Sequence, residues 1–273
     1  MSSVPYWRKN LYNDHGLPDN YTHSSFLEEL RKNVKPNNVL KNEAITLGAG
    51  ISIQLSIVVL FIIVFVWLNN EWTTPNIIFT VSAMLTVLAY FLYSLKFPNT
   101  LDRISTDFRT VLIFLTFGYI VSPILKTLTE TVSTDTIYVM TVSMFLTHLI
   151  FSKYGSPPVS LSDSLSITSS LFGSLMLTSR LASPLHAFSL LTIAVLCFVL
   201  LPFVLSQIES KKLVALIFAI TTWYFLYPIS ITFSWVFVIA TIFLYVICPL
   251  WYVKWQTYKE NIYGPWDEAV ITS

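Results

Sequence analysis

Residues 45–68 read ITLGAGISIQLSIVVLFIIVFVWL, an apolar stretch without a single charged side chain. An α-helix rises about 1.5 Å per residue, so about 20 apolar residues cross a hydrocarbon core of roughly 30 Å. The stretch is long enough for this, and its apolar residues do not alternate with polar ones as they would in a barrel strand. Residues 45–68 therefore predict a transmembrane helix.

The whole chain has the composition of a membrane protein. Of its 273 residues, 54% are hydrophobic and 11% are charged, and the mean hydropathy is +0.66, whereas soluble domains carry roughly 25% charged residues. Seven further apolar runs occupy about residues 75–95, 108–125, 136–151, 163–181, 185–205, 213–227 and 231–251. We expect an all-α bundle of about eight transmembrane helices over residues 45–251, between an N-terminal arm (1–44) and a C-terminal tail (252–273). The runs at 163–181 and 213–227 are short, so six spans remain an alternative.

The basic residues predict the orientation of this bundle. Of the 16 Lys and Arg, 14 fall in the two termini and in alternate gaps between the runs, and the other side receives only Lys126 and Arg180. Because basic residues are enriched in cytoplasmic loops, an even number of spans with both termini in the cytoplasm is expected. The glycosylation sequon at Asn20 then stays in the cytoplasm, unmodified.

Small residues recur every four positions in two of the runs. Such stripes let helix backbones approach closely, which matters in lipid because packing and hydrogen bonds there drive association. We interpret them as helix-packing faces. The alternative is a polar path through the run at 163–181, as in a transporter or lipid scramblase. The stripe residues are Gly48, Ser52 and Ser56 in the first run, and Ser166, Ser170 and Ser174 in the fifth.

Polar residues between and within the runs are candidates for contact with a lipid head group or with another subunit. The connector between the third and fourth runs is rich in hydroxyls and charges, and His148 and His186 lie near span ends. The simpler interpretation is a capped turn, with hydrogen-bonded packing for the histidines. A helix start is predicted at Ser183-Pro184, and Asp135 is expected to cap the fourth span. The candidates are Lys126, Thr129, Glu130, Thr134, Asp135, His148, Arg180 and His186.

The two polar ends carry candidate protein contacts. A short amphipathic helix is expected over about residues 25–34, where Ser25 and Glu28 have the spacing of a capping box and Phe26 and Leu30 share the apolar face. In the tail, a rigid Gly-Pro turn presents an aromatic side chain and is followed by two acids. These tail residues are Gly264, Pro265, Trp266, Asp267 and Glu268.

The sequence carries no catalytic motif. It has no phosphate-binding glycine loop, no HExxH and no GxSxG, and Cys197 and Cys248 lie inside expected spans without metal-ligand spacing. The longest segment outside the apolar runs is the arm at 1–44, which is too short for a nucleotide-binding domain. A net charge of +1 is too small to create the broad positive potential that attracts nucleic acid. No cofactor and no metal are expected.

Several blocks nevertheless resemble a known family. They are LKTLTETVSTDTIY at 125–138, HLIF at 148–151, SRL at 179–181 with LHAF at 185–188, and KENIYGPWDEA at 259–269. The arm contributes PDNY at 18–21 and FLEELRKN at 26–33. In this order they are similar to the PIG-C family, one of the membrane components of phosphatidylinositol N-acetylglucosaminyltransferase.

The resemblance implies a multi-pass subunit of an endoplasmic-reticulum complex. That complex performs the first step of GPI-anchor synthesis, moving N-acetylglucosamine from UDP-GlcNAc to phosphatidylinositol on the cytoplasmic face. The implied partners are other membrane subunits, including a separate catalytic glycosyltransferase, and phosphatidylinositol itself is a possible ligand. This chain is then expected to be a scaffold or a lipid-positioning subunit, not the catalytic one. The expected orientation places residues 126–135 on the lumenal side, away from the nucleotide sugar, so a structural or contact role is favoured there.

Overall fold

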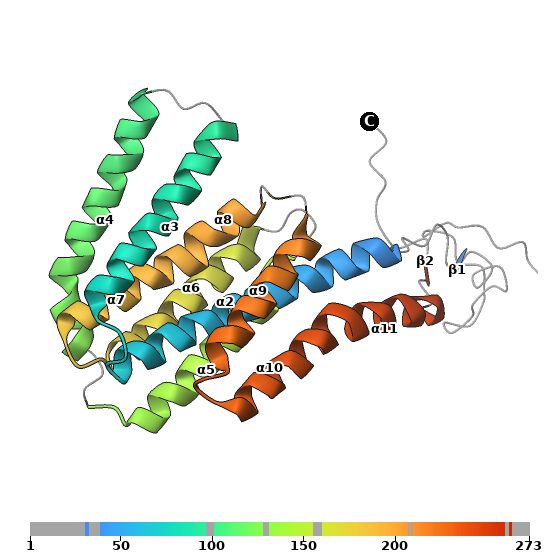
Figure 1. The fold of residues 1–273 in the computed structure, drawn as a ribbon. Coiled ribbons are helices and arrows are strands. Elements are labelled where there is room, and N and C mark those ends of the chain that lie inside the picture. The colour runs from blue at the N-terminus through green and yellow to red at the C-terminus, as the bar shows by residue number, and fades with distance from the viewer. Residues whose placement is uncertain are drawn as a thin grey trace, which may run out of the picture. The chain divides into compact units, whose positions relative to one another are not determined.

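All eight apolar runs form helices in the computed structural model, which describes residues 31–32, 39–96, 101–127, 131–154, 160–206, 208, 210–259 and 262–263. The all-α expectation is therefore confirmed. The helices are α2 (Lys41–Asn69), α3 (Pro75–Lys96), α4 (Leu101–Thr127), α5 (Thr134–Phe151), α6 (Ser160–Thr178), α7 (Pro184–Val195), α8 (Leu201–Ser206), α9 (Lys211–Leu226), α10 (Ile231–Ile242) and α11 (Cys248–Trp255), followed by a 3-10 turn at Gln256–Tyr258 (Figure 1).

Four continuous helices among the described residues are long and apolar enough to cross a membrane. They cover Lys41–Asn69, Thr134–Phe151, Pro184–Ser206 and Ile231–Tyr258. Shorter apolar helices cover Pro75–Phe91, Phe108–Ile124 and Ser164–Thr178. The first of the four is also the most buried, so it forms the centre of the bundle.

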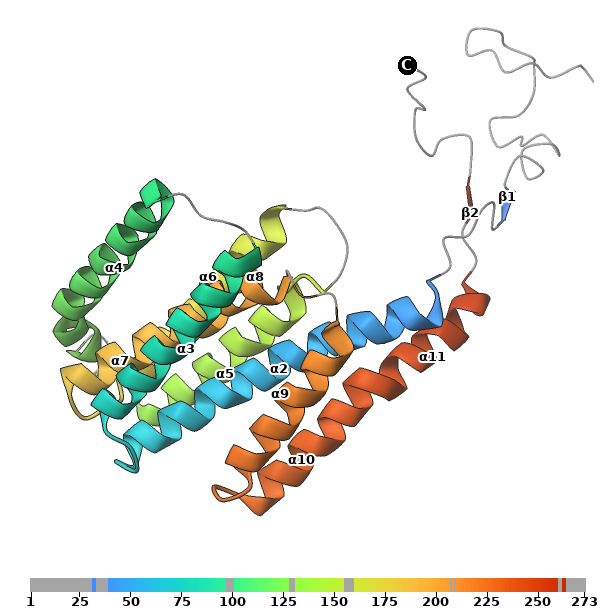
Figure 2. The ribbon, with the colours of Figure 1, turned by 45° about the horizontal axis from the view of Figure 1, so that its top comes forward.

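Helix α2 runs between the pair α9–α10 and the helices α5 and α7 (Figures 1 and 2). The core around it is aromatic. The ring of Phe61 on α2 lies 5.8 Å from that of Phe145 on α5 and 5.3 Å from that of Phe198, both edge to face. Edge-to-face pairs contribute roughly 0.5–1.5 kcal/mol beyond the burial of their area. These three rings therefore join α2, α5 and the helix that begins with α7.

Two helices are interrupted by a π-helical turn. One turn covers Leu196–Leu200 between α7 and α8, and the other covers Phe243–Ile247 between α10 and α11. A proline follows two residues after each turn, at Pro202 and Pro249. Because proline has no N–H and its ring collides with the carbonyl four residues earlier, a regular α-helix cannot continue unchanged through it. The wider π-turn accommodates the proline without ending the helix.

The carboxyl end of α2 is closed by a Schellman motif. The N–H of Trp72 donates to the Trp67 carbonyl at 3.0 Å, and the N–H of Glu71 donates to the Leu68 carbonyl at 3.4 Å. Glu71 adopts the left-handed conformation, with φ of 57°, at the position where glycine is usual. A side chain with a Cβ atom is strained in this conformation.

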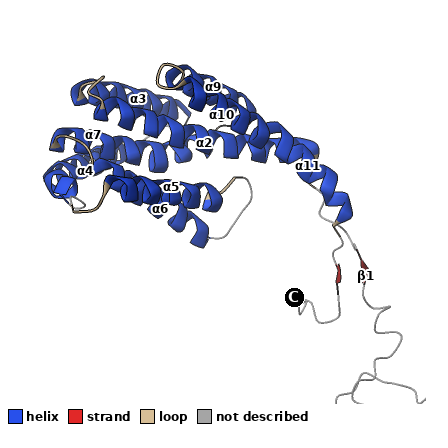
Figure 3. Cartoon of the chain, turned by 90° about the horizontal axis from the view of Figure 1, so that it is seen from below, coloured by secondary structure: helices blue, strands red, loops and turns tan. Residues whose placement is uncertain are grey.

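The chain divides into two compact units, Lys41–Trp251 and a second unit formed by Met1–Leu40 with Tyr252–Ser273. In the second unit, strand β1 (Arg31–Lys32) pairs antiparallel with strand β2 (Ile262–Tyr263) (Figure 3). The N–H of Val39 in the same unit donates to Gln256 Oε1 at 3.1 Å. The helix expected over residues 25–34 is therefore wrong at Arg31–Lys32, and its other residues lie outside the described ones. The strand pairing satisfies backbone groups that a short isolated helix, marginal in water, would have to satisfy alone.

Candidate functional site

One end of the bundle is tied together around Arg180. Arg180 follows α6, and its Nη2 donates to the carbonyl of Val132, which stands just before α5. A second bond links two helices: Ser122 of α4 donates its hydroxyl to the carbonyl of Pro184, the first residue of α7. We call Val132, Arg180, Ser183 and His186 the Arg180 cluster. It joins the connector between α4 and α5 to the connector between α6 and α7.

The helix starts at this end are capped by serines. Ser183 is the N-cap of α7, and its Oγ lies 2.6 Å from His186 Nδ1 and accepts from the His186 N–H at 3.4 Å. The start predicted at Ser183-Pro184 is thus confirmed. For α5 the cap is Ser133, not Asp135. Asp135 lies inside the first turn, where a carboxylate interacts favourably with the positive end of the helix dipole. The cap itself is Ser133, whose hydroxyl accepts from the Thr136 N–H.

The remaining candidates of the 125–136 connector are placed only in part. Thr134 and Asp135 are exposed in the first turn of α5. Thr129 and Glu130 lie outside the described residues, and Lys126 lies in the last turn of α4 without a described side chain. The structure therefore brings Arg180 to this connector and His186 to Ser183.

His148 lies at the other end of α5, away from the Arg180 cluster. It is buried, and its Nδ1 lies 2.9 Å from both the carbonyl and the hydroxyl oxygen of Ser166 on α6. Ser152 Oγ lies 2.8 Å from Ser166 Oγ and donates to the His148 carbonyl at 2.8 Å. The imidazole packs edge to face on Phe198 at 5.2 Å, and its Nε2 makes no hydrogen bond with any described residue. His148, Ser152 and Ser166 thereby lock the α5–α6 hairpin.

The serine stripe of α6 is buried against α5. Ser170 donates to the Ile167 carbonyl at 2.9 Å, Ser174 to the Ser170 carbonyl at 2.7 Å, and Thr178 to the Ser174 carbonyl at 2.7 Å. These hydroxyls donate their protons to their own helix and are fully buried, so they present no row of O–H donors to a passage. At Gly173, an added Cβ would lie 3.2 Å from Met144 Cβ. This geometry favours a packing face over the alternative of a polar path.

The stripe of α2 faces the second π-turn. An added Cβ at Gly48 would lie 2.5 Å from Pro249 Cγ, 2.9 Å from the Leu244 oxygen and 3.1 Å from the Tyr245 oxygen. Only glycine permits this approach. Ser52 and Ser56 are buried on the same face, and Ser56 donates to the Ser52 carbonyl at 2.8 Å.

The candidates of the arm and the tail fall outside the described residues, which begin at Arg31 and end at Tyr263. Nothing in the structure bears on their contacts. They are Phe26, Leu30, Gly264, Pro265, Trp266, Asp267 and Glu268.

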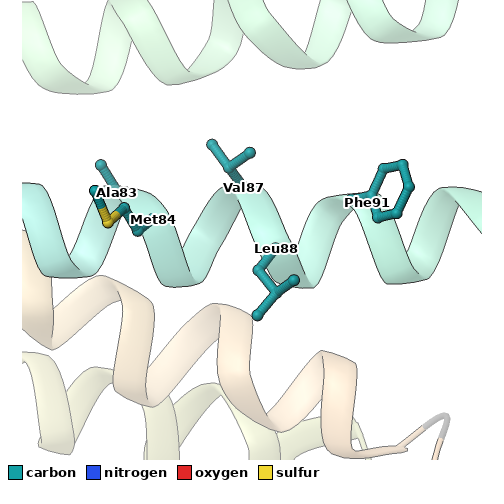
Figure 4. Close-up of a pocket in the computed structure, with 5 residues that line it drawn as sticks. All are labelled: Ala83, Met84, Val87, Leu88 and Phe91. Atoms are coloured by element: carbon teal, nitrogen blue, oxygen red, sulfur yellow. The ribbon is translucent and has the colours of Figure 1, made fainter.

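The described residues bury no pair of acid–base groups inside the bundle. Their buried polar side chains are serines, threonines and His148, without a carboxylate among them, and no three metal-ligating side chains in the described segments cluster. An open apolar groove of about 470 Å³ is lined by α3 alone, through Ala83, Met84, Val87, Leu88 and Phe91 (Figure 4). A groove without polar groups can accommodate a hydrocarbon chain or a helix but cannot activate a sugar donor.

Sequence reasoning missed the π-turns and the residues within them. Phe198 is the ring on which both His148 and Phe61 pack, yet it stands in an apolar run with nothing to distinguish it. The signal was the proline: Pro202 and Pro249 each lie inside a run that is otherwise long enough to be one uninterrupted helix.

These features define a helical membrane protein in which most described hydroxyls bond to their own helix and a few polar groups, at His148 and Arg180, join neighbouring elements. Comparison with known proteins then identifies the family. A family model described as phosphatidylinositol N-acetylglucosaminyltransferase, GPI2, matches residues 7–267. The chain belongs to this family, as its sequence blocks predicted.

Named relatives cover nearly the whole chain. It is 36% identical over 275 residues to the C subunit of phosphatidylinositol N-acetylglucosaminyltransferase from Bos taurus and 35% identical to that from Homo sapiens, in both cases over 97% of this chain and 93% of the relative. It is 31% identical to the GPI2 subunit of Schizosaccharomyces pombe, over 97% of this chain and 86% of the relative. No solved structure matches the chain significantly.

Proposed function

We propose that this chain is a membrane subunit of the endoplasmic-reticulum complex that transfers N-acetylglucosamine from UDP-GlcNAc to phosphatidylinositol. The observation that carries the proposal is the 36% identity, over 97% of the chain, to a protein named as the C subunit of that transferase. The role proposed for it is to scaffold the other subunits and help position the inositol lipid, while a separate subunit performs the transfer.

The scaffold role is supported by what the polar residues do. Glycosyl transfer needs a binding site for the nucleotide and groups that stabilise charge as the leaving diphosphate departs. In the described part of the bundle, polar side chains instead bond to their own helix, as Ser174 does, or to a neighbouring element, as Ser166 does with His148 and Arg180 with the Val132 carbonyl. We propose that the Arg180 cluster is a structural contact at the lumenal end, which can also present its exposed neighbours to a subunit or a lipid head group.

For the membrane topology we propose eight spans with both termini in the cytoplasm. The start of α2 and the end of the last long helix lie at one end of the bundle, because Gly48 contacts Pro249. A chain that enters and leaves at the same end crosses an even number of times. The excess of Lys and Arg at the termini and in alternate gaps supports a cytoplasmic assignment for that end. A glycan on Asn20 would refute the orientation.

The terminal unit is the proposed attachment point for the catalytic partner. The arm and the tail pair with each other through β1 and β2, and the candidate contact residues Leu30 and Gly264 adjoin those strands in the sequence. An attachment on the cytoplasmic side places a partner where UDP-GlcNAc is expected.

The test is purification of the tagged full chain in mild detergent, followed by an assay of N-acetylglucosamine transfer to phosphatidylinositol. Transferase activity should co-purify with the wild-type chain. Deletion of residues 259–273 should abolish this co-purification while the chain stays inserted in the membrane. For Trp266→Ala, loss of activity with the complex intact would indicate lipid positioning, whereas loss of the complex would indicate a scaffold. Wild-type chain that recovers no transferase refutes the proposal.

A further inference from the structure

Two parts of the chain repeat the same helix design 47 residues apart. Ser183 caps α7 and Ser230 caps α10, each accepting from the N–H three residues later. Each cap is followed by 12 residues of α-helix, a π-turn of 5 residues and a proline, at Pro202 and Pro249. Each helix is also the second of a hairpin, α6–α7 or α9–α10. The two hairpins are structural repeats.

The faces of α7 and α10 that point inward are buried alike. Three pairs of equivalent residues are at most 9% exposed in both helices. In the preceding helices, Ser174 of α6 and Thr222 of α9 are both fully buried, and each donates to the carbonyl four residues earlier. These two lie 48 residues apart, because the loop from α6 to the cap of α7 is one residue longer than that from α9 to the cap of α10. Both hairpins therefore use the same inner surface. The three pairs are Ala187 with Ser234, Leu190 with Phe237, and Ala194 with Thr241.

The outer faces of α7 and α10 differ. Phe188 is 8% exposed, but its equivalent Trp235 is 58% exposed. The same contrast holds for Ser189 and Val236, at 1% and 56%, and for Thr192 and Ile239, at 8% and 66%. On α7 this face is covered, and on α10 no element of the described chain covers it.

Helices α3 and α4 of the same chain cover the outer face of α7. The ring of Phe188 lies 5.0 Å from Phe79 of α3 and 5.8 Å from Tyr119 of α4, and it touches α4 so closely that an added Cβ at Gly118 would lie 3.1 Å from it. The first repeat thus buries its outer aromatic side chain beneath two transmembrane helices of the same chain. The second repeat presents a tryptophan at the equivalent place, with no counterpart to α3 and α4 in the described chain.

We infer that the outer face of α10, formed by Trp235, Val236 and Ile239, docks a transmembrane helix of another subunit. This inference rests on the proposed function, because it assigns the missing cover to the complex. The face is uncharged, so its occupant is embedded in the membrane. Helix packing in lipid depends on shape and not on hydrophobicity, and the large Trp235 side chain provides an anchor that a partner helix can cover as α3 and α4 cover Phe188.

A steric wedge tests the docking face. Ile239→Trp in the tagged full chain should lower the recovered transferase activity about tenfold or more, which corresponds to about 1.4 kcal/mol of lost binding. The matched control is Ile217→Trp on α9, whose side chain is 54% exposed and which should recover activity like wild type. Equal recovery from both variants, with wild type active, overturns the docking face and leaves the proposed function intact. Wild type without activity refutes the proposed function itself.

A photoreactive phenylalanine analogue placed at Trp235 identifies the occupant. The expected product joins this chain to a membrane protein that co-purifies with the transferase activity, and the same analogue at Ile217 should not form it. A product containing two copies of this chain, or lipid adducts alone, overturns the inference.

Discussion

Replacing Gly48 with alanine should destabilise the protein, and the structure gives the reason. The added Cβ would lie 2.5 Å from Pro249 Cγ and 2.9 Å from the Leu244 oxygen. Real Cβ atoms do not approach this closely, and the oxygen belongs to a helix backbone that cannot rotate away. Helix α2 must therefore move off the second π-turn, and overpacking of this kind costs about 1–3 kcal/mol.

The gain in helix propensity works against that cost. Alanine is favoured over glycine by about 0.8–1.0 kcal/mol in a helix interior, so a control must carry the same gain without the collision. Gly50→Ala on the same helix provides it, because its Cβ would lie 3.3 Å from the Tyr154 oxygen and 3.4 Å from its ring. This approach is tight, but it is 0.8 Å longer than the shortest one at Gly48, so a shift of Tyr154 by a few tenths of an ångström relieves it.

The assay is thermal unfolding of the two variants in detergent, followed by loss of the monodisperse peak in size-exclusion chromatography. A change of 1 kcal/mol shifts Tm by about 2–4 °C for a chain of this order. Gly48→Ala should lower Tm by several degrees, and Gly50→Ala should leave it unchanged or raise it. Pro249→Ala should restore part of the loss in a Gly48→Ala background, since it removes the nearest atom. Equal Tm values for the two glycine variants would refute the reasoning.

Three further substitutions have expected outcomes, two in the same thermal assay and one in unfolding measured as a function of pH. Glu71→Gly should raise Tm by about 2 °C, because glycine relieves the left-handed strain at the end of α2; a lower Tm would mean the glutamate side chain is needed there. Phe61→Ala, which removes the ring between Phe145 and Phe198, should cost about 3–5 kcal/mol, whereas Phe233→Ala on the exposed surface should change Tm little. Burial raises the pKa of Tyr154 to about 12 despite its hydrogen bond with Ser152, so the folded state keeps a proton that the unfolded chain loses near pH 10. The free energy of unfolding should then fall between about pH 10 and 12 in wild type and fall less in Tyr154→Phe, and parallel curves would contradict this.

The helices were predictable because length and apolarity alone determine them. Residues 45–68 needed no tertiary information, and Ser183-Pro184 marked a helix start through local chemistry that holds in any fold. The strand pairing of Arg31–Lys32 was not predictable in this way, since its partner lies at Ile262–Tyr263. Local spacing favoured a helix there, and a distant segment decided otherwise.

The candidate site was predictable in its residue types and not in its contacts. Arg180 stood out because an arginine between apolar runs is rare, but its bond to the Val132 carbonyl depends on how two connectors meet. The two matching hairpins were not predicted, because what they share is a serine cap, a helix length, a π-turn and a proline, and the apolar residues between these points differ. Phe188 and Trp235 stand at equivalent positions of the two hairpins, and only the folded structure shows that the first is buried and the second exposed.

The contact between Gly48 and Pro249 also bears on the order in which this protein can be made. Gly48 is synthesised 201 residues before Pro249, so the second π-turn and its proline are made long after α2. Until then, α2 lacks the neighbours that bury its small-residue face. In a newly made chain, α2 therefore stays in the membrane without its packing partner, and chaperones and degradation machinery can bind its unpacked face. Variants truncated before Cys248 should be recognised as orphans even though every remaining helix can insert.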